Sequence, residues 1–315
     1  IQNRMGIGDT IIFLPFIKAL SKKFNSPISL LVKENSKADQ YLFETEYIDE
    51  ILILKRDIKL DNRHGGIFGF FNLIKDIKKY NFEKIIIFNS SFRYYLVAKF
   101  SGISELYQYP LFKKTKQHIV NTPREFMRSK LKLDVNEDPE IQINERLVAD
   151  AINKFQMNKN ELNILLGIGG SGPTKRIPAS TFLNLIKKIL NFKKCKFFLA
   201  TGKSEGEQNI LEKILGSEFK NYCIPLNNLT IKETLPIIKN CNLSVCNDSS
   251  FSHLSAALGI KTITLMADTP IIYGNYNTKM FPVIPDGEET VTHNTLGKDK
   301  INSEKILNKI FEILN

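Results

Sequence analysis

Short apolar runs alternate with amphipathic segments along most of the chain. In the first half we expect strands at residues 28–32, 50–54 and 84–89, and helices up to 24, at 36–44 and at 65–79. In the second half the same pattern predicts strands at residues 163–168, 196–201 and 243–246. Such alternation is typical of parallel sheets with helices on both faces. The pattern therefore predicts an α/β fold with doubly wound, Rossmann-like sheets.

Two amphipathic segments carry specific expectations about packing. In the helix expected at 65–79, Phe68, Phe71, Ile74 and Ile77 recur at helical spacing, so we expect them to form one core-facing stripe. The last helix, at 303–314, is also amphipathic, and we expect it to pack back on the N-terminal domain.

An acidic and polar stretch at residues 133–162 separates the two halves of the pattern. It contains a helix expected at about 145–155, and we place the linker between domains here. A chain of 315 residues is long for one core and suits two domains of roughly 150 residues. We therefore expect an N-terminal domain at 1–150 and a C-terminal domain at 151–315.

Composition narrows the class of protein. The net charge of +11 favours an anionic partner, and no apolar run reaches the roughly 18 residues that span a bilayer. The four cysteines have no paired C-x-x-C spacing, so we expect buried thiols and a cytoplasmic protein, without a zinc site. The chain begins inside an expected first strand, so we expect a few residues to precede residue 1. We expect Gly6 and Gly8 to make a tight turn after that strand.

The positive charge concentrates at residues 84–132, which hold ten Lys or Arg against two acids. The basic residues that we select as candidates for binding an anionic acceptor are Lys113, Lys114, Lys116 and Arg124. Three interpretations stay open: a solvated basic face, a receptor for an anionic acceptor, or a surface lying against anionic lipid. No recognised nucleic-acid motif accompanies the charge, so we expect no nucleic-acid partner.

Residues 243–259 read as a buried strand, a polar turn and a helix that ends near Gly259. Ser249 or Ser250 is a good N-cap, and the helix start leaves backbone N–H groups that favour an anion. Asp248 and His253 lie beside that opening. The competing interpretation is an ordinary capped helix with a solvated Asp.

A glycine-dense loop follows the strand expected at 163–168. Its glycines allow backbone amides to approach phosphate oxygens closely, and Lys175 brings a mobile positive charge to the same loop. The G-x-x-x-x-G-K-[ST] loop is not present, which argues against a P-loop NTPase. The second half thus has two candidate phosphate-binding loops, each at the end of an expected strand.

Three segments together resemble the heptosyltransferase family, glycosyltransferase family 9. Gly8-Asp9 with Leu14-Pro15 is similar to the family's Gly-Asp-x-x-His-x-Leu-Pro, residues 175–182 to its Lys-Arg-Trp-Pro-x-x-x-Phe, and residues 248–257 to its Asp-(Thr/Ser)-Gly-x-x-His-x-x-Ala-Ala. The departures are Ile12 for His, Ile177 for Trp and Ser250 for Gly.

The resemblance implies two Rossmann-like domains facing across a cleft, the arrangement called GT-B. It implies an inverting, metal-independent bacterial glycosyltransferase that moves heptose from ADP-heptose to a lipopolysaccharide inner-core acceptor. Asp9 is then the catalytic base and Lys175 stabilises the leaving diphosphate. The residues implied in donor binding are Gly170, Ser171, Lys175, Glu207, Leu229, Asp248, Ser249, Ser250 and His253.

Several alternatives stay open beside this one. For Glu207 the competing interpretation is a charged helix start, and for Leu229 it is core packing. The same fold with another nucleotide sugar or acceptor, or a catalytically silent protein that binds an anionic glycan, would fit the same residues. No cofactor or metal ligand set is indicated, and peripheral contact with the inner membrane at its cytoplasmic face follows from an anionic lipid-linked acceptor.

Overall fold

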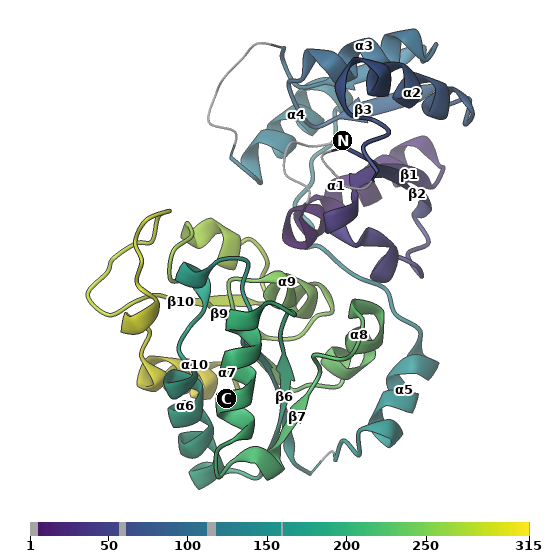
Figure 1. The fold of residues 1–315 in the computed structure, drawn as a ribbon. Coiled ribbons are helices and arrows are strands. Elements are labelled where there is room, and N and C mark those ends of the chain that lie inside the picture. Colours follow the sequence, from purple (N-terminus) through teal and green to yellow (C-terminus); the bar gives the residue numbers. More distant parts are fainter. Residues whose placement is uncertain (1–5, 57–60, 112–117, 159, 315) are drawn as a thin grey trace. The chain divides into compact units, whose positions relative to one another are not determined.

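The computed structural model describes residues 6–56, 61–111, 118–158 and 160–314 (Figure 1). By its internal contacts the chain divides into two compact units, residues 1–137 and 138–315. Each unit contains its own buried apolar cluster.

The first unit alternates helices and strands. Its elements are α1 (Ile7–Phe24), β1 (Ile28–Lys33), β2 (Ile48–Leu54), α2 (Gly66–Lys78), β3 (Lys84–Ile87), α3 (Phe92–Phe100), β4 (Glu105–Gln108) and α4 (Asn121–Leu131). Among the described residues β1 pairs in parallel with β2, and β3 pairs in parallel with β4. The strand that we expect before α1 falls on residues 1–5, which lie outside the described residues.

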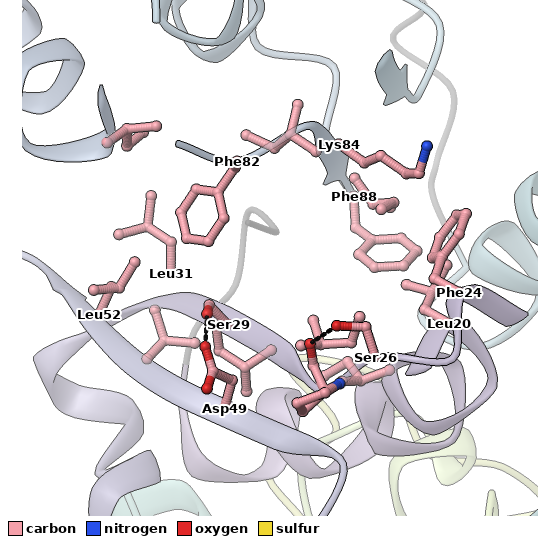
Figure 2. A pocket seen from close by; sticks show the side chains of 18 of the residues that line it. Leu20, Phe24, Ser26, Ser29, Leu31, Asp49, Leu52, Phe82, Lys84 and Phe88 are labelled. Carbon is pink, nitrogen blue, oxygen red and sulfur yellow. Dashed lines mark hydrogen bonds between the residues drawn. The ribbon is translucent and has the colours of Figure 1, made fainter. Parts of the chain in front are cut away.

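A cavity of about 530 Å³ lies between the two strand pairs of the first unit. Figure 2 shows Phe82, Lys84 and Phe88 on the β3 side of it and Leu31 and Leu52 on the side of β1 and β2. Its lining comes mainly from strand edges and apolar helix faces, not from the loops at strand ends that carry polar groups in α/β proteins. This cavity is therefore not at the position where α/β proteins bind ligands.

The first unit departs from the sequence-based predictions at three places. The helix expected at 36–44 is absent, and two short 3₁₀ turns, Glu34–Ser36 and Ala38–Gln40, stand there instead. Lys37 between them has φ +48°, a left-handed conformation that interrupts an α-helix. Gly8, expected in a turn, lies inside α1, and Gly6 is the N-cap.

The buried face of α2 is also not the expected one. Ile74 and Ile77 enter the core as predicted, together with Gly69 and Leu73, but Phe68 and Phe71 are exposed. The segment is apolar on two overlapping faces, so periodicity alone could not select the one that packs.

The second unit has one parallel sheet of six strands in the order β10-β9-β8-β5-β6-β7. Its strands are β5 (Leu162–Gly167), β6 (Cys195–Ala200), β7 (Cys223–Pro225), β8 (Leu243–Asn247), β9 (Thr262–Leu265) and β10 (Met280–Val283). Its helices are α5 (Glu145–Lys154), α6 (Ala179–Phe192), α7 (Glu205–Leu215), α8 (Ile231–Lys239), α9 (Ser250–Ala257) and α10 (Ser303–Leu314). All its strand pairs are parallel, as the alternating pattern predicts.

Both faces of this sheet are covered. Ile164 and Leu166 of β5 join the apolar cluster beneath α6, α7 and α10, while Leu165, which points to the opposite face, is equally buried. Continuous apolar runs in the central strands follow from burial on both faces.

The two amphipathic ends of the second unit both pack within it. The helix expected in the linker is α5, and its Val148 carbonyl accepts a hydrogen bond from Asn240 after α8. The C-terminal helix α10 packs on α6, with a Lys188–Glu304 ion pair and an edge-on contact of Phe192 with Phe311. The linker between units therefore precedes α5.

The four cysteines are buried free thiols, as the spacing predicts. In the described part of the chain, no helix combines the length and apolar character needed to cross a membrane.

Candidate functional site

The strands of the second unit are all parallel, so they end at the same edge of the sheet. The chain runs from β5 outward through β6 to β7, then returns to the other side of β5 as β8 and continues to β9 and β10. The strand order therefore reverses between β5 and β8, and open α/β sheets bind ligands at the carboxyl edge beside such a reversal. The two loops selected from the sequence leave β5 and β8, so both lie at this edge.

Lys175 and Asp248 connect these two loops. The Lys175 Nζ lies 2.6 Å from Asp248 Oδ2, and the Asp248 carboxylate is 5% exposed while the lysine retains more exposure. Burial by itself would raise the pKa of Asp248, but the charge of Lys175, then that of His253 and the hydrogen bond from Lys175, outweigh it and lower that pKa. Asp248 is thus an ionised, buried anchor for a positive charge at the sheet edge.

His253 lies on the first turns of α9 and is buried. Its Nδ1 is 2.8 Å from the Tyr276 hydroxyl, and the two rings are stacked with centroids 5.6 Å apart. Burial lowers the pKa of His253 to about 4, more than the nearby Asp248 raises it. The imidazole is therefore neutral near neutral pH.

The start of α9 has the cap that the sequence predicts. Ser249 is the N-cap and Ser250 is the first helical residue. The Ser249 hydroxyl oxygen is buried and, within the described residues, has no hydrogen-bond partner. An unpartnered buried hydroxyl at a helix N-terminus is suited to an oxygen of a bound anion.

The glycine loop after β5 is held from two sides. The Gly170 N–H donates to Glu207 Oε1 at 2.9 Å, and the Gly170 carbonyl accepts from Arg176 Nε at 2.9 Å. Ser171 follows it and is exposed, and Lys175 ends the short 3₁₀ turn Pro173–Lys175. The loop conformation is therefore fixed at Gly170 while Ser171 faces solvent.

Glu207 connects the loop after β5 to the loop after β6. Besides Gly170, its carboxylate accepts from the N–H groups of Gly202 and Ser204 at 3.3 Å and from the Ser204 hydroxyl at 2.6 Å. A Cβ added at Gly169 or Gly202 would come within 2.5 Å of this carboxylate. The side chain thus forms the N-terminal capping box of α7 and also joins the two loops.

The remaining candidates belong to other elements. Leu229 is half-buried just before Thr230, the N-cap of α8. Asp9 belongs to the first unit, at the third residue of α1, where its Oδ2 accepts from the Gly6 N–H at 3.1 Å. Arg124 on α4 donates through Nε to the Val135 carbonyl at 3.2 Å. Of the basic candidates, Lys113, Lys114 and Lys116 lie outside the described residues.

Two contacting residues were not selected from the sequence, Tyr276 and Arg176. Tyr276 is in the loop after β9, and β9 is the neighbour of β8 in the sheet, so the sheet order would have placed it near His253. Arg176 directly follows Lys175, and its role toward Gly170 depends on a loop conformation that the sequence does not specify. In the described parts of the chain no group of three His, Cys, Asp or Glu side chains could hold a metal ion.

Comparisons with known proteins point to one family. The family model of glycosyltransferase family 9 (heptosyltransferase) matches residues 86–283. Lipopolysaccharide heptosyltransferase 1 of Campylobacter coli is 28% identical over 178 residues, so the match spans about half of that relative, 52%, and 54% of this chain. Lipooligosaccharide heptosyltransferase 2 of Campylobacter jejuni serotype O:6 is 25% identical over 90% of this chain and 93% of that protein.

Solved structures show the same fold over nearly the whole chain. Escherichia coli ADP-heptose lps heptosyltransferase II superposes with a TM-score of 0.73 at 18% identity, covering 99% of this chain and 96% of that one. A family 9 glycosyl transferase from Veillonella parvula gives a TM-score of 0.78 at 16% identity, covering 98% and 94%. These matches confirm the predicted α/β fold with parallel sheets, and with the family match they establish that the chain belongs to glycosyltransferase family 9, the heptosyltransferases.

Proposed function

We propose that this glycosyltransferase moves a heptose from ADP-heptose to an inner-core acceptor of lipopolysaccharide, with inversion at the anomeric carbon and without a metal ion. Family membership supports the class of reaction. The names of the Campylobacter relatives support a lipopolysaccharide or lipooligosaccharide acceptor. The E. coli heptosyltransferase WaaC, a structural neighbour, was solved with ADP and with ADP-2-deoxy-2-fluoro heptose, which supports the donor.

The ion pair of Lys175 and Asp248 at the reversal of strand order is the observation that carries the proposal. A buried carboxylate is a poor ligand for a diphosphate because like charges repel, so we assign Asp248 to holding Lys175. The 2.6 Å contact fixes the ammonium group at the sheet edge before any donor binds. Preorganised positive charge is what a leaving diphosphate needs as its negative charge grows in the transition state.

Uncharged hydrogen-bond donors supplement the positive charge of Lys175. When the Tyr276 hydroxyl donates to His253 Nδ1, the single ring proton resides on Nε2, which then donates to a phosphate or sugar oxygen. The Ser249 hydroxyl and the first N–H groups of α9 supply further donors. Gly170, Ser171 and Ser250 form the rest of this diphosphate-binding site. Glu207 positions Gly170, and Leu229 lines the nucleobase pocket.

Asp9 supplies the base in this proposal. The acceptor hydroxyl attacks the anomeric carbon, the bond from that carbon to the β-phosphate oxygen breaks, and the hydroxyl proton passes to the Asp9 carboxylate. ADP leaves with the electron pair of the broken bond. The hydrogen bond from the Gly6 N–H to Asp9 Oδ2 orients the carboxylate at the start of α1. The acceptor's anionic groups bind Lys113, Lys114, Lys116 and Arg124, at the cytoplasmic face of the inner membrane.

A pair of variants separates the two halves of this mechanism. Asp9→Asn removes the base and should lower turnover by about a hundredfold or more while leaving ADP affinity unchanged. Lys175→Gln removes the diphosphate charge and should weaken ADP binding by about tenfold or more as well as slowing transfer. The measurements are calorimetric titration with ADP and transfer of heptose to a heptose-deficient lipopolysaccharide acceptor.

The matched control for Lys175 is Lys187→Gln, because Lys187 is an exposed lysine of α6 in the same unit. The control should behave as the unaltered protein does in both assays. Turnover by Asp9→Asn at the unaltered rate would refute the base assignment. ADP binding without any transfer by the unaltered protein would favour the silent glycan-binding alternative, and transfer of another sugar would keep the site while replacing the donor.

A further inference from the structure

The start of α2 exposes large apolar side chains to solvent. Ile67 is 77% exposed, Phe68 86% and Phe71 61%, and their spacing of one and four residues places them on one side of the helix. Single exposed apolar residues are common, but several on adjoining turns form a patch that marks an interaction site. The apolar stripe expected to enter the core thus faces water at this end of the helix.

The helix α3 lies beside α2 (Figure 1), and one of its aromatic side chains extends this patch. The half-buried ring of Phe70 contacts Phe71, with ring centroids 5.2 Å apart, and Phe100 of α3, at 6.2 Å. Phe100 is itself 59% exposed. We define the aromatic patch as Ile67, Phe68, Phe71 and Phe100, which surround Phe70 on two helices.

Cations border the aromatic patch. Lys75 follows Phe71 by one helical turn, Lys78 lies one turn further, and Lys99 precedes Phe100. Among the described residues Lys75, Lys78 and Lys99 have no acidic partner, whereas Arg63 and Lys79 pair with Asp76. Residues 62–104 hold seven Lys or Arg and two acids, a net charge of +5 (7 − 2).

We infer that the aromatic patch docks on the surface of an anionic phospholipid bilayer. Phe68, Phe71 and Ile67 enter the boundary between headgroups and acyl chains, and Lys75, Lys78 and Lys99 contact the lipid phosphates. An apolar helix face bordered by lysines has this effect at membrane surfaces, where each juxtamembrane cation adds to the attraction. A positive charge around an apolar centre complements an anionic bilayer.

A second copy of the chain fits the same surface less well. In a two-fold symmetric contact the same patch is used by both subunits, so the bordering lysines of one copy would approach those of the other. No acidic side chain alternates with Lys75 and Lys78 on the exposed side of α2 to offset that repulsion, since Asp76 is engaged by Arg63 and Lys79. The charge distribution therefore favours an anionic bilayer over a second copy of the chain.

Sedimentation with lipid vesicles tests the inference on the full chain, without donor or acceptor. The protein should bind vesicles that contain phosphatidylglycerol, bind pure phosphatidylcholine vesicles far less, and be released by salt. The double variant Phe68→Ser and Phe71→Ser should weaken binding to the anionic vesicles by roughly tenfold or more. Lys75→Gln with Lys78→Gln should weaken it by several-fold and reduce the salt dependence.

Phe192→Ser is the matched control, because Phe192 is 67% exposed but lies on α6 of the second unit. It should bind vesicles as the unaltered protein does, and circular dichroism should show every variant folded. Unchanged vesicle binding by the Phe68 and Phe71 variant would overturn the inference, as would absence of vesicle binding by the unaltered chain. A dimer that this variant dissociates, with vesicle binding intact, would assign the patch to a second copy instead. Because no sugar transfer is measured, failure here leaves the proposed enzyme activity standing.

Discussion

At the scale of single residues, the candidate site combines one charged pair with one neutral histidine. Lys175 and Asp248 are 73 residues apart in sequence and meet because β5 and β8 are neighbours in the sheet. His253 is near enough to feel both charges, yet burial dominates its ionisation. In the candidate site, Asp248 therefore balances the positive charge of Lys175 when no diphosphate is bound. His253 contributes hydrogen bonds without a net charge.

The neutral state of His253 has a consequence for stability in mild acid. In the folded protein its pKa is about 4, below the value near 6.5 of an unfolded chain. As the pH falls from about 6.5 to about 4, the unfolded chain gains a proton that the folded one does not, so folding is progressively disfavoured, by about 3 kcal/mol in total. The measurement is the free energy of urea unfolding of the second unit between about pH 7 and pH 5.

The variant His253→Gln should lose this part of the pH dependence, and the exposed His293→Gln serves as control and should retain it. Carboxylates with lowered pKa values, such as Asp248, also destabilise the fold in acid, but chiefly at lower pH. Equal slopes for the two histidine variants would mean that His253 is charged in the folded protein.

At the scale of elements, the site depends on a contact between the loop after β5 and the start of α7. Glu207 Oε1 accepts from the amides of Gly170 and Gly202, and Oε2 accepts from Ser204. In Glu207→Gln, an NH2 group would replace one accepting oxygen and would face these backbone and hydroxyl donors. This substitution should lower the free energy of unfolding by about 1–3 kcal/mol. Since Gly170 begins the loop that carries Lys175, ADP affinity should fall as well.

Glu205→Gln is the control, because Glu205 is an exposed acid at the first position of the same helix. Urea unfolding and ADP titration together separate three roles for Glu207. Loss of stability with unchanged ADP affinity would show a helix cap only, and loss of affinity at full stability would show direct contact with the donor. Loss of both is the outcome expected for a side chain that positions the loop.

The elements also show what the sequence could and could not specify. The three strands predicted in the second unit, β5, β6 and β8, match the structure to within about a residue because central parallel strands are continuous apolar runs, and Ser249 was recognisable as a helix start. The buried side of α2 was not, because Phe68 and Phe71 continue the helical spacing of Ile74 and Ile77. The contact of Arg176 with Gly170 depends on a loop conformation that residue spacing does not predict.

At the scale of the whole molecule, the proposed donor site lies within one of two separately packed units. The second unit has its own core beneath α6, α7 and α10, and the first has a core of α2, α3 and β3. A ligand that binds only the folded second unit stabilises that unit by mass action, by about 2.7 kcal/mol at a concentration one hundred times its Kd. Stabilisation by ADP should therefore be confined to residues 138–315.

Hydrogen exchange of backbone amides measures this unit by unit. With saturating ADP, the slowest amides of β5 and β8 should exchange up to about a hundredfold more slowly, because opening of the unit then requires release of the ligand. Amides of α1 and β1 should exchange as before. Lys175→Gln should abolish the protection at the same ADP concentration, whereas Asp9→Asn should preserve it. Equal protection of both units would contradict the expectation that stabilisation by ADP is confined to the second unit.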